Sequence, residues 1–214
     1  MDCWVKIKKH LICNDKMMEE LIELYGKPTL FNSLIPETNL FDSLANSIIS
    51  QQLSVQVVKN IKRKLYELGA VEKFNPDLFI TSSYEDLRNC GMSKAKCDYT
   101  KGLANRIKKD PDFLRNMINE TDEKVISDLT TIKGIGVWTA QMFLLFALKR
   151  LDIFSAKDAG LMRGVKLTYF NGTLPTTEEL ENVTGRWSPY RSIGSWYMWQ
   201  VANAQPTIKG KGNN

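Results

Sequence analysis

The sequence predicts an all-α fold. Apolar residues recur at every third or fourth position along most of the chain, which is the periodicity of an amphipathic helix. Alternation of apolar and polar residues, which is typical of a strand, never lasts more than a few residues. Breaks that contain glycine or proline separate segments of about ten to fifteen residues, a common helix length in globular proteins.

Each expected helix can be assigned in order from its apolar positions. In chain order these are Met17, Leu21 and Leu24; Leu44, Ile48 and Ile49; Val57, Val58, Ile61, Leu65 and Leu68; Leu103 and Ile107; Val125 and Leu129; Phe143, Leu144 and Ala147. The breaks between them lie at residues 26–28, 69, 75–76, 91, 110–111, 172 and 175. Ser83 and Thr177 are expected at helix starts, because the acidic residues that follow suit the positive end of the helix dipole.

The composition excludes several kinds of site. The 214 residues include 29 Lys and Arg against 24 Asp and Glu, a net charge of +5, and one histidine, His10. Zinc hydrolase sites commonly need two or three histidines, and a Ser-His-Asp triad would have only this one to use. Cys3, Cys13, Cys90 and Cys97 form no CxxC pair, so neither a metal site nor a disulfide framework is expected. No apolar run approaches the roughly 18 residues of a membrane span, and we expect an intracellular protein.

Positive charge gathers in residues 53–109, where twelve Lys and Arg stand against six acids. Such a stretch is compatible with a polyanionic partner such as nucleic acid. Charge alone fits solvated helix faces equally well, so both interpretations remain open.

Residues 129–141 predict a helix, a tight turn and a second helix. Gly134 and Gly136 flank one apolar residue, Ile135, and their lack of side chains leaves the backbone amides of the turn accessible. The second helix would begin near Val137, where the positive end of its dipole adds to the attraction for a phosphate. Hairpins of this kind can hold a DNA strand without reading its bases. A turn without a ligand remains the alternative.

Asp158 stands about one helix further along the chain, at the start of the next helical segment. An N-cap that accepts backbone hydrogen bonds is by itself a sufficient explanation for an aspartate at this place. The residue is therefore informative only together with the motifs around it.

The order of four motifs resembles the helix-hairpin-helix DNA glycosylase superfamily. The first is the run Gly134, Gly136, Trp138, Thr139 and Ala140, followed by Asp158 at the place of the superfamily's acid. The other three resemble its 3-methyladenine DNA glycosylase II (alkylbase DNA glycosylase) branch: Gln51-Gln52-x-Ser54 at the end of residues 46–54, Gly91-Met92-Ser93-x-x-Lys96, and Trp187-x-Pro189-Tyr190-Arg191-Ser192. The resemblance covers about residues 10–205.

The resemblance implies two helical lobes with an active-site cleft between them. Residues 36–148 would form most of one lobe, which carries the hairpin, and residues 1–35 with 149–214 would form the other. Asp158 would face the cleft. Two departures are visible: Ser155 stands where relatives often have proline, and the cysteine cluster that holds iron and sulfur in the endonuclease III branch is missing.

The implied activity is that of a monofunctional DNA glycosylase, a hydrolase that removes 3-methyladenine and by extension 7-methylguanine and so initiates base excision repair. Asp158 would be the catalytic carboxylate, stabilising positive charge on the sugar and orienting water, after the nucleotide has flipped out of the duplex. Trp138 stands where members that also cut the backbone have a lysine. Neither Lys133 nor Lys157 occupies that position, so no lyase activity is expected.

The resemblance also assigns residues to the base pocket. Trp138 and Trp187 would line it, since indole rings favour a cationic base, and core packing is the alternative for each. Tyr190 and Arg191 are expected to be structural, and Trp196 and Trp199 are expected in the core.

The expected DNA contacts lie in two segments. The hairpin would contribute Lys133, Gly134, Ile135, Gly136 and Thr139. Gln52 and Leu53 would form the tip that enters the duplex and fills the gap left by the flipped nucleotide. The alternative places Leu53 in the core at a helix kink, with Ser54 capping the next helix.

No cofactor and no iron–sulfur cluster are expected, and a monovalent cation at the hairpin is the one ion that the resemblance allows. The expected partner is double-stranded DNA with damaged bases, bound by a monomer in the cytoplasm, nucleoid or nucleus.

A glycosylase for a neutral lesion (uracil, mismatched thymine or oxidised guanine) and a non-catalytic helix-hairpin-helix DNA-binding module are the alternatives. A helical adaptor for other proteins would explain neither the hairpin nor Asp158.

Overall fold

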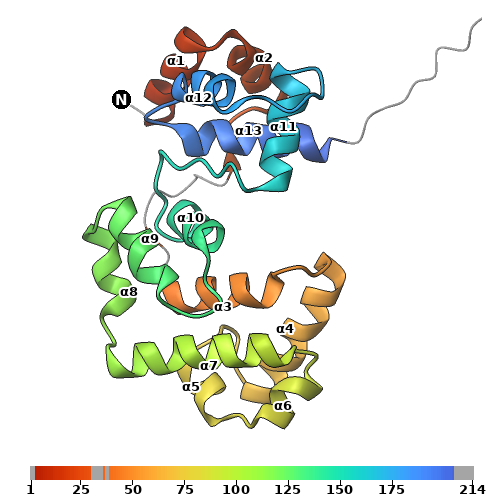
Figure 1. Cartoon of the computed structure of the whole chain (residues 1–214), viewed down its shortest axis with the longest axis vertical. Coiled ribbons are helices and arrows are strands. Elements are labelled where there is room, and N and C mark those ends of the chain that lie inside the picture. Colours follow the sequence, from red (N-terminus) through yellow and green to blue (C-terminus); the bar gives the residue numbers. More distant parts are fainter. Residues whose placement is uncertain (1–2, 30–35, 37–38, 205–214) are drawn as a thin grey trace, which may run out of the picture. The chain divides into compact units, whose positions relative to one another are not determined.

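The computed structural model describes residues 3–29, 36 and 39–204. Over these residues the chain consists of helices and turns without a strand, which confirms the predicted all-α fold (Figure 1). The chain divides into two compact units, unit 1 with Met1–Leu34 and Arg150–Asn214, and unit 2 with Ile35–Lys149. The limits of unit 2 lie one residue outside the predicted limits at 36 and 148.

Unit 2 contains the hairpin and the whole of the basic stretch, residues 53–109. Its helices are α3 (Leu40–Ser50), α4 (Val55–Gly69), α5 (Pro76–Thr81), α6 (Tyr84–Asn89), α7 (Lys94–Lys109), α8 (Phe113–Asn116), the 3-10 helix η2 (Met117–Asn119), α9 (Asp122–Thr130) and α10 (Val137–Phe146). The α3 helix packs against α4, α7, α8 and α10, and its residues Leu44, Ile48 and Ile49 are fully buried. The α10 helix carries apolar residues all round, as expected of a helix with neighbours on several sides.

Side-chain caps fix the starts of several of these helices. Ser83 forms a capping box with Asp86 at the start of α6, at the predicted place. Asn39 caps α3 through the amide of Asp42, and Ser93 caps α7. Each cap satisfies a backbone N–H that the first turn of a helix leaves without a partner, typically for about 1 kcal/mol.

Unit 1 joins the two ends of the chain. It contains α1 (Cys3–Asn14) and α2 (Lys16–Tyr25) together with α11 (Ala159–Tyr169), α12 (Thr177–Gly185) and α13 (Arg191–Asn203). The α13 helix packs against α2, α11 and α12, so the red N-terminal and blue C-terminal helices of Figure 1 share one core. Thr176 and Glu179 form the capping box of α12, so the cap is the residue before the predicted Thr177.

Gly164 allows α11 and α13 to lie against each other. A methyl group at this position would overlap the main-chain carbonyl of Met198, so no side chain fits between the two helices here. This close packing matters for the site, because α11 begins at the predicted catalytic acid.

A buried carboxylate connects three parts of unit 1. Asp15 is 3% exposed and caps α2 by accepting the amide of Met17. Its Oδ2 accepts hydrogen bonds from the Tyr169 hydroxyl at 2.8 Å and from the Trp187 indole Nε1 at 2.9 Å. Burial, followed by the nearby charge of Asp15, raises the pKa of Tyr169, so its hydroxyl keeps the proton that it donates.

Candidate active site

Asp158 is held by the start of α11. It is the N-cap of that helix, in an extended backbone conformation, and its Oδ1 accepts the amide of Leu161 at 2.7 Å. The same oxygen accepts the indole Nε1–H of Trp199 at 2.9 Å. Two donors from two helices thus orient a half-buried carboxylate at the positive end of a helix dipole. The capping role is compatible with the predicted catalytic role, because the cap orients the carboxylate.

Trp199 corrects the expectation that this residue lies in the core. It is half-buried, and its polar edge meets the carboxylate of Asp158. Gly160 lies beside this contact: a methyl group there would be in ordinary van der Waals contact, at 3.4 Å, with both Trp199 Cδ1 and Asp158 Oδ1. Trp196 is also half-buried, with its ring edge-on to Tyr197. The available sequence signal was Gly164, where α11 allows the close approach of another helix.

The segment that leads to Asp158 is fastened by an ion pair. Arg191 reaches Asp152 with two nitrogens, Nε to Oδ1 at 2.8 Å and a terminal nitrogen to Oδ2 at 3.0 Å. The Ser188 hydroxyl donates to Asp152 Oδ2 at 2.9 Å. Burial alone would raise the pKa of Asp152, but the hydrogen bonds from Arg191 and Ser188 outweigh it and the pKa lies below its ordinary value. The pair therefore stays charged at neutral pH.

Ser192 fastens the same segment through backbone atoms. Its hydroxyl donates to the carbonyl of Arg150 at 2.7 Å and accepts the amide of Ile153 at 2.9 Å. The motif from Trp187 to Ser192 thus holds residues 150–153, a few positions before Asp158. Arg191 is structural, in agreement with the sequence-based interpretation.

Trp187 is placed differently from its predicted role in the base pocket. Its side chain is completely buried, and its indole donates to Asp15. Phe154 and Tyr169 approach its ring, and Gly194 lies so close that a methyl group there would overlap it. A ring enclosed in this way offers no face to a flipped base, so this placement favours the core alternative.

The hairpin is present in unit 2. The α9 helix ends at Thr130 and α10 begins at Val137. Gly134 has φ +93°, in the left-handed region, and a methyl group there would overlap the ring of Tyr99. Ile135 directs its side chain into the core, and its amide donates to the carbonyl of Ile132 at 3.0 Å. Gly136 is the exposed N-cap of α10 and provides no side-chain cap, which leaves that helix start accessible to an anion.

Positive charge adjoins the hairpin. A hollow of about 320 Å³ is lined by Gly102, Asn105, Arg106, Lys109, Thr131, Ile132 and Lys133. Arg106 is engaged, since it pairs with Asp110 at 3.5 Å and lies 4.1 Å from the centre of the Phe113 ring. Lys109 and Lys133 are exposed, so two cations border this hollow.

The turn between α3 and α4, residues 51–54, is called the wedge turn from here on. Gln52 is exposed with φ +55°, and Leu53 is 38% exposed. Leu53 is therefore not a core residue, which removes the structural alternative for it. Ser54 is the N-cap of α4, although its side chain makes no capping hydrogen bond.

Gln51 connects the wedge turn to the hairpin. Its Nε2 donates to the carbonyl of Gly134 at 3.0 Å and to the hydroxyl of Thr139 at 3.4 Å. Thr139 is only 2% exposed, so its side chain faces the interior and does not offer a hydroxyl to DNA, which corrects that expectation. Sequence reasoning had not assigned a role to Gln51.

Trp138 lies in the first turn of α10 and is half-buried. The expected monovalent cation at the hairpin stays a prediction. Two of the carbonyls there already accept hydrogen bonds, that of Ile132 from Ile135 and that of Gly134 from Gln51.

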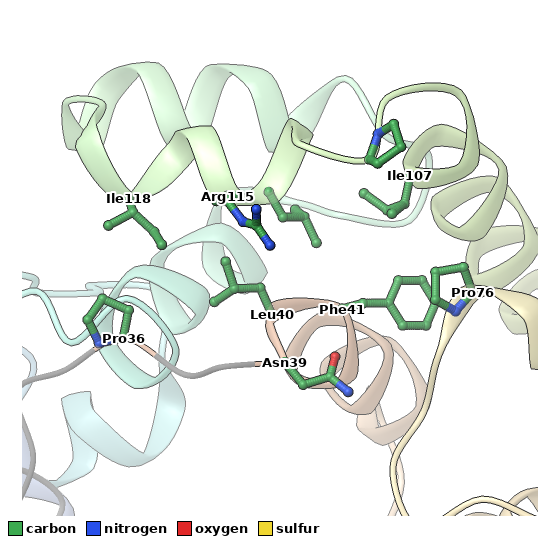
Figure 2. Close-up of a pocket in the computed structure, with 10 residues that line it drawn as sticks. Pro36, Asn39, Leu40, Phe41, Pro76, Ile107, Arg115 and Ile118 are labelled. Carbon is green, nitrogen blue, oxygen red and sulfur yellow. The ribbon is translucent and has the colours of Figure 1, made fainter.

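A second hollow in unit 2, of about 520 Å³, contains none of the predicted site residues. It is lined by Pro36, Asn39, Leu40, Phe41, Pro76, Ile107, Pro111, Leu114, Arg115 and Ile118. Figure 2 shows Leu40 pointing toward the side on which Arg115 and Ile118 lie. The walls are mostly aliphatic, with Asn39 and Arg115 as the polar side chains.

Neither a metal-binding cluster nor a membrane-spanning helix occurs among the described residues. No group of three or more His, Cys, Asp or Glu side chains among them could hold a metal ion. No helix within the same residues is both long and apolar enough to cross a bilayer.

The chain is similar to known proteins over nearly its whole length. Residues 45–189 match the family described as HhH-GPD superfamily base excision DNA repair protein. The chain is 30% identical to the alkylbase DNA glycosidase-like protein mag2 of Schizosaccharomyces pombe over 210 residues, which cover 97% of this chain and 96% of that one.

Two solved structures resemble the fold. One is the DNA-3-methyladenine glycosidase of Bacillus halodurans, with a TM-score of 0.79 and 34% identity over 92% of this chain and 88% of that one. The other is the 3-methyladenine DNA glycosylase Mag1 of Schizosaccharomyces pombe in complex with abasic DNA, with a TM-score of 0.78 and 26% identity over 91% of this chain and 95% of that one. The hairpin, the motif order and these matches show that the chain belongs to the HhH-GPD superfamily of base excision DNA repair proteins.

Proposed function

We propose that this chain is a monofunctional DNA glycosylase that releases alkylated purines, 3-methyladenine foremost and 7-methylguanine as a second substrate, from double-stranded DNA. The observation that carries the proposal is the carboxylate of Asp158, held by the amide of Leu161 and the indole of Trp199. The names of the relatives, alkylbase and 3-methyladenine glycosylases, support the substrate class. The enzyme acts as a monomer and initiates base excision repair.

The reaction replaces the bond between C1′ of the sugar and the base nitrogen by a bond to water oxygen. The electron pair of the broken bond leaves with the base, and the water gives up a proton. Positive charge develops on the sugar in the transition state, and a fixed carboxylate beside it lowers the barrier without having to reorganise. Asp158 has that role, and its remaining task is to orient the attacking water.

The substrate class follows from the leaving group. An alkylated purine already carries positive charge, so it departs readily and needs little acid assistance. An indole face attracts such a cation. Trp199, whose edge is bonded to Asp158, is the half-buried indole that we assign to this task.

DNA binding is assigned to unit 2. The accessible start of α10 and the exposed Lys133 hold phosphates of one strand without reading its sequence. Gln52 and Leu53 of the wedge turn enter the duplex, since unstacking a nucleotide costs a few kcal/mol and an inserted side chain holds the open state.

The activity is tested by incubating the protein with methylated duplex DNA and identifying released bases by chromatography. We expect free 3-methyladenine. Uracil-containing DNA is the matched substrate for the neutral-lesion alternative. Release of uracil without any methylated base would transfer the assignment to that alternative, and binding to both DNAs with no release would indicate a non-catalytic module.

The product is expected to stay uncut until it is heated or treated with alkali. Trp138 cannot form a Schiff base with the sugar, and the exposed Lys133 and Lys157 are not at the position where lyases carry their amine. The measurement is borohydride trapping during turnover, analysed by denaturing gel. A covalent protein–DNA adduct would contradict the assignment.

A further inference from the structure

The backbone of the wedge turn is weakly held by its own hydrogen bonds. The amide of Gln51 reaches the carbonyl of Ile48, and the amide of Leu53 that of Ser50, both at a long 3.4 Å. Gln52 has φ +55°, in the left-handed region, which is strained for a residue with a side chain. A turn with such weak internal support needs contacts from outside to keep one conformation.

Lys96 of α7 supplies those contacts. Its Nζ donates to the carbonyl of Ile49 at 2.7 Å and to the carbonyl of Gln51 at 2.8 Å. These carbonyls lie at the end of α3, where a helix leaves carbonyls without partners and its dipole is negative. A charged donor makes the stronger kind of hydrogen bond, so the ammonium fixes the last turn of α3 and the first residue of the wedge turn together.

Gln51 extends this connection to the hairpin. Lys96 holds its carbonyl, while its side chain donates to the carbonyl of Gly134. The hairpin, the wedge turn and α7 are therefore joined through a single residue at the base of the turn. The contacts of Lys96 and of the Gln51 side chain do not involve the exposed tip, Gln52 and Leu53.

We propose that Lys96 is a positioning residue that locks the wedge turn, through Gln51, in the conformation that keeps an opened duplex open. The inference rests on the proposed function and on the insertion of Gln52 and Leu53. A turn that can relax from its strained form fills the gap less well, and the flipped nucleotide returns to the stack more often. Lys96 then matters most where the lesion is paired, because re-pairing competes with excision there.

The chain provides a matched control on the same helix. Lys101 of α7 donates to the carbonyls of Phe79 at 2.7 Å and Ser82 at 2.6 Å, at the end of α5. Lys96→Met and Lys101→Met each remove one positive charge and one pair of hydrogen bonds to the end of a helix. Only the first variant releases the wedge turn.

Excision is measured in single turnovers at saturating protein, with the alkylated base either correctly paired or opposite a mismatch. We expect Lys96→Met to slow excision from the paired duplex about tenfold more than from the mismatch, in line with the loss of charged hydrogen bonds. Lys101→Met should affect both substrates equally, and Lys96→Arg should recover part of the loss because guanidinium can also donate to two carbonyls. Equal losses on both substrates in Lys96→Met would overturn the inference.

Amide hydrogen exchange provides a readout that does not depend on activity. Exchange at Gln51 and Leu53, whose amides are the hydrogen-bonded ones of the turn, should accelerate in Lys96→Met and stay unchanged in Lys101→Met. If the wild-type protein releases no base, the proposed function fails, and exchange alone then decides the role of Lys96. Unchanged exchange in Lys96→Met would show that the wedge turn does not depend on this lysine.

Discussion

Asp158→Asn is expected to slow base release by a factor on the order of 10²–10³, the usual cost of removing one preorganised electrostatic stabiliser. The substitution removes the negative charge that opposes the developing charge on the sugar. It keeps an oxygen that can accept from Leu161 and from Trp199, and asparagine caps a helix about as well as aspartate. The melting temperature and the affinity for methylated DNA should therefore change little. The rate is measured in single turnovers with saturating protein.

Asp152→Asn is the matched control for this result. Asp152 lies on the segment that leads to Asp158, and its carboxylate serves the ion pair with Arg191. Asp152→Asn should lower the stability of the protein. The rate of base release by the molecules that remain folded should fall much less than it does in Asp158→Asn. Near-normal release of base by Asp158→Asn would remove that residue from the catalytic role.

Asp15→Ala is expected to lower the free energy of unfolding by about 4 kcal/mol. The indole of Trp187 and the hydroxyl of Tyr169 lose their buried acceptor, at about 1–3 kcal/mol each, and α2 loses its cap, at about 1 kcal/mol. For a chain of this size the melting temperature should fall by about 8–16 °C. The measurement is thermal unfolding followed by circular dichroism.

Thr121→Ala is the matched control, because it measures the cost of losing a helix cap without the loss of buried hydrogen bonds. Thr121 caps α9 through the amide of Lys124 and is exposed, so its loss should cost about 1 kcal/mol and nothing more. If Asp15→Ala and Thr121→Ala cost the same, the hydrogen bonds from Trp187 and Tyr169 contribute nothing to stability.

Local chemistry made parts of the site predictable. Gly134 and Gly136 marked the hairpin because the first has a positive φ and the second leaves a helix start accessible. Ser83 marked a helix start because a hydroxyl followed by an acid satisfies amides within a single turn. The N-cap role of Asp158 was predictable for the same reason, whereas its catalytic role is assigned by the motif alone.

The residues that were misplaced depend on packing between helices distant in sequence. Nothing within α13 shows that Trp199 meets Asp158, because the contact is set by the approach of α11 at Gly164. Trp187 was assigned to the pocket by the motif resemblance, and the sequence does not reveal its buried acceptor, Asp15, at the other end of the chain. Lys96 reaches the end of α3 along a flexible side chain, and sequence spacing does not reveal such a contact.

Unit 1 is assembled from chain segments that leave the ribosome at very different times. The α2 helix appears early, but α13, against which it packs, appears after the whole of unit 2. Until then Asp15 lacks both Tyr169 and Trp187, and the carbonyl of Gly26 lacks the hydroxyl of Tyr197.

Unit 2 can fold before the end of the chain is made, because residues 35–149 are continuous. Domains generally fold as units during synthesis, in the order of their appearance. The hairpin and the wedge turn can therefore be complete while Asp158 is still without Trp199. A chain interrupted before α13 would have the surface assigned to DNA, but its Asp158 would lack one of its two donors, so that translation sets the order in which the DNA surface and the complete carboxylate site are formed.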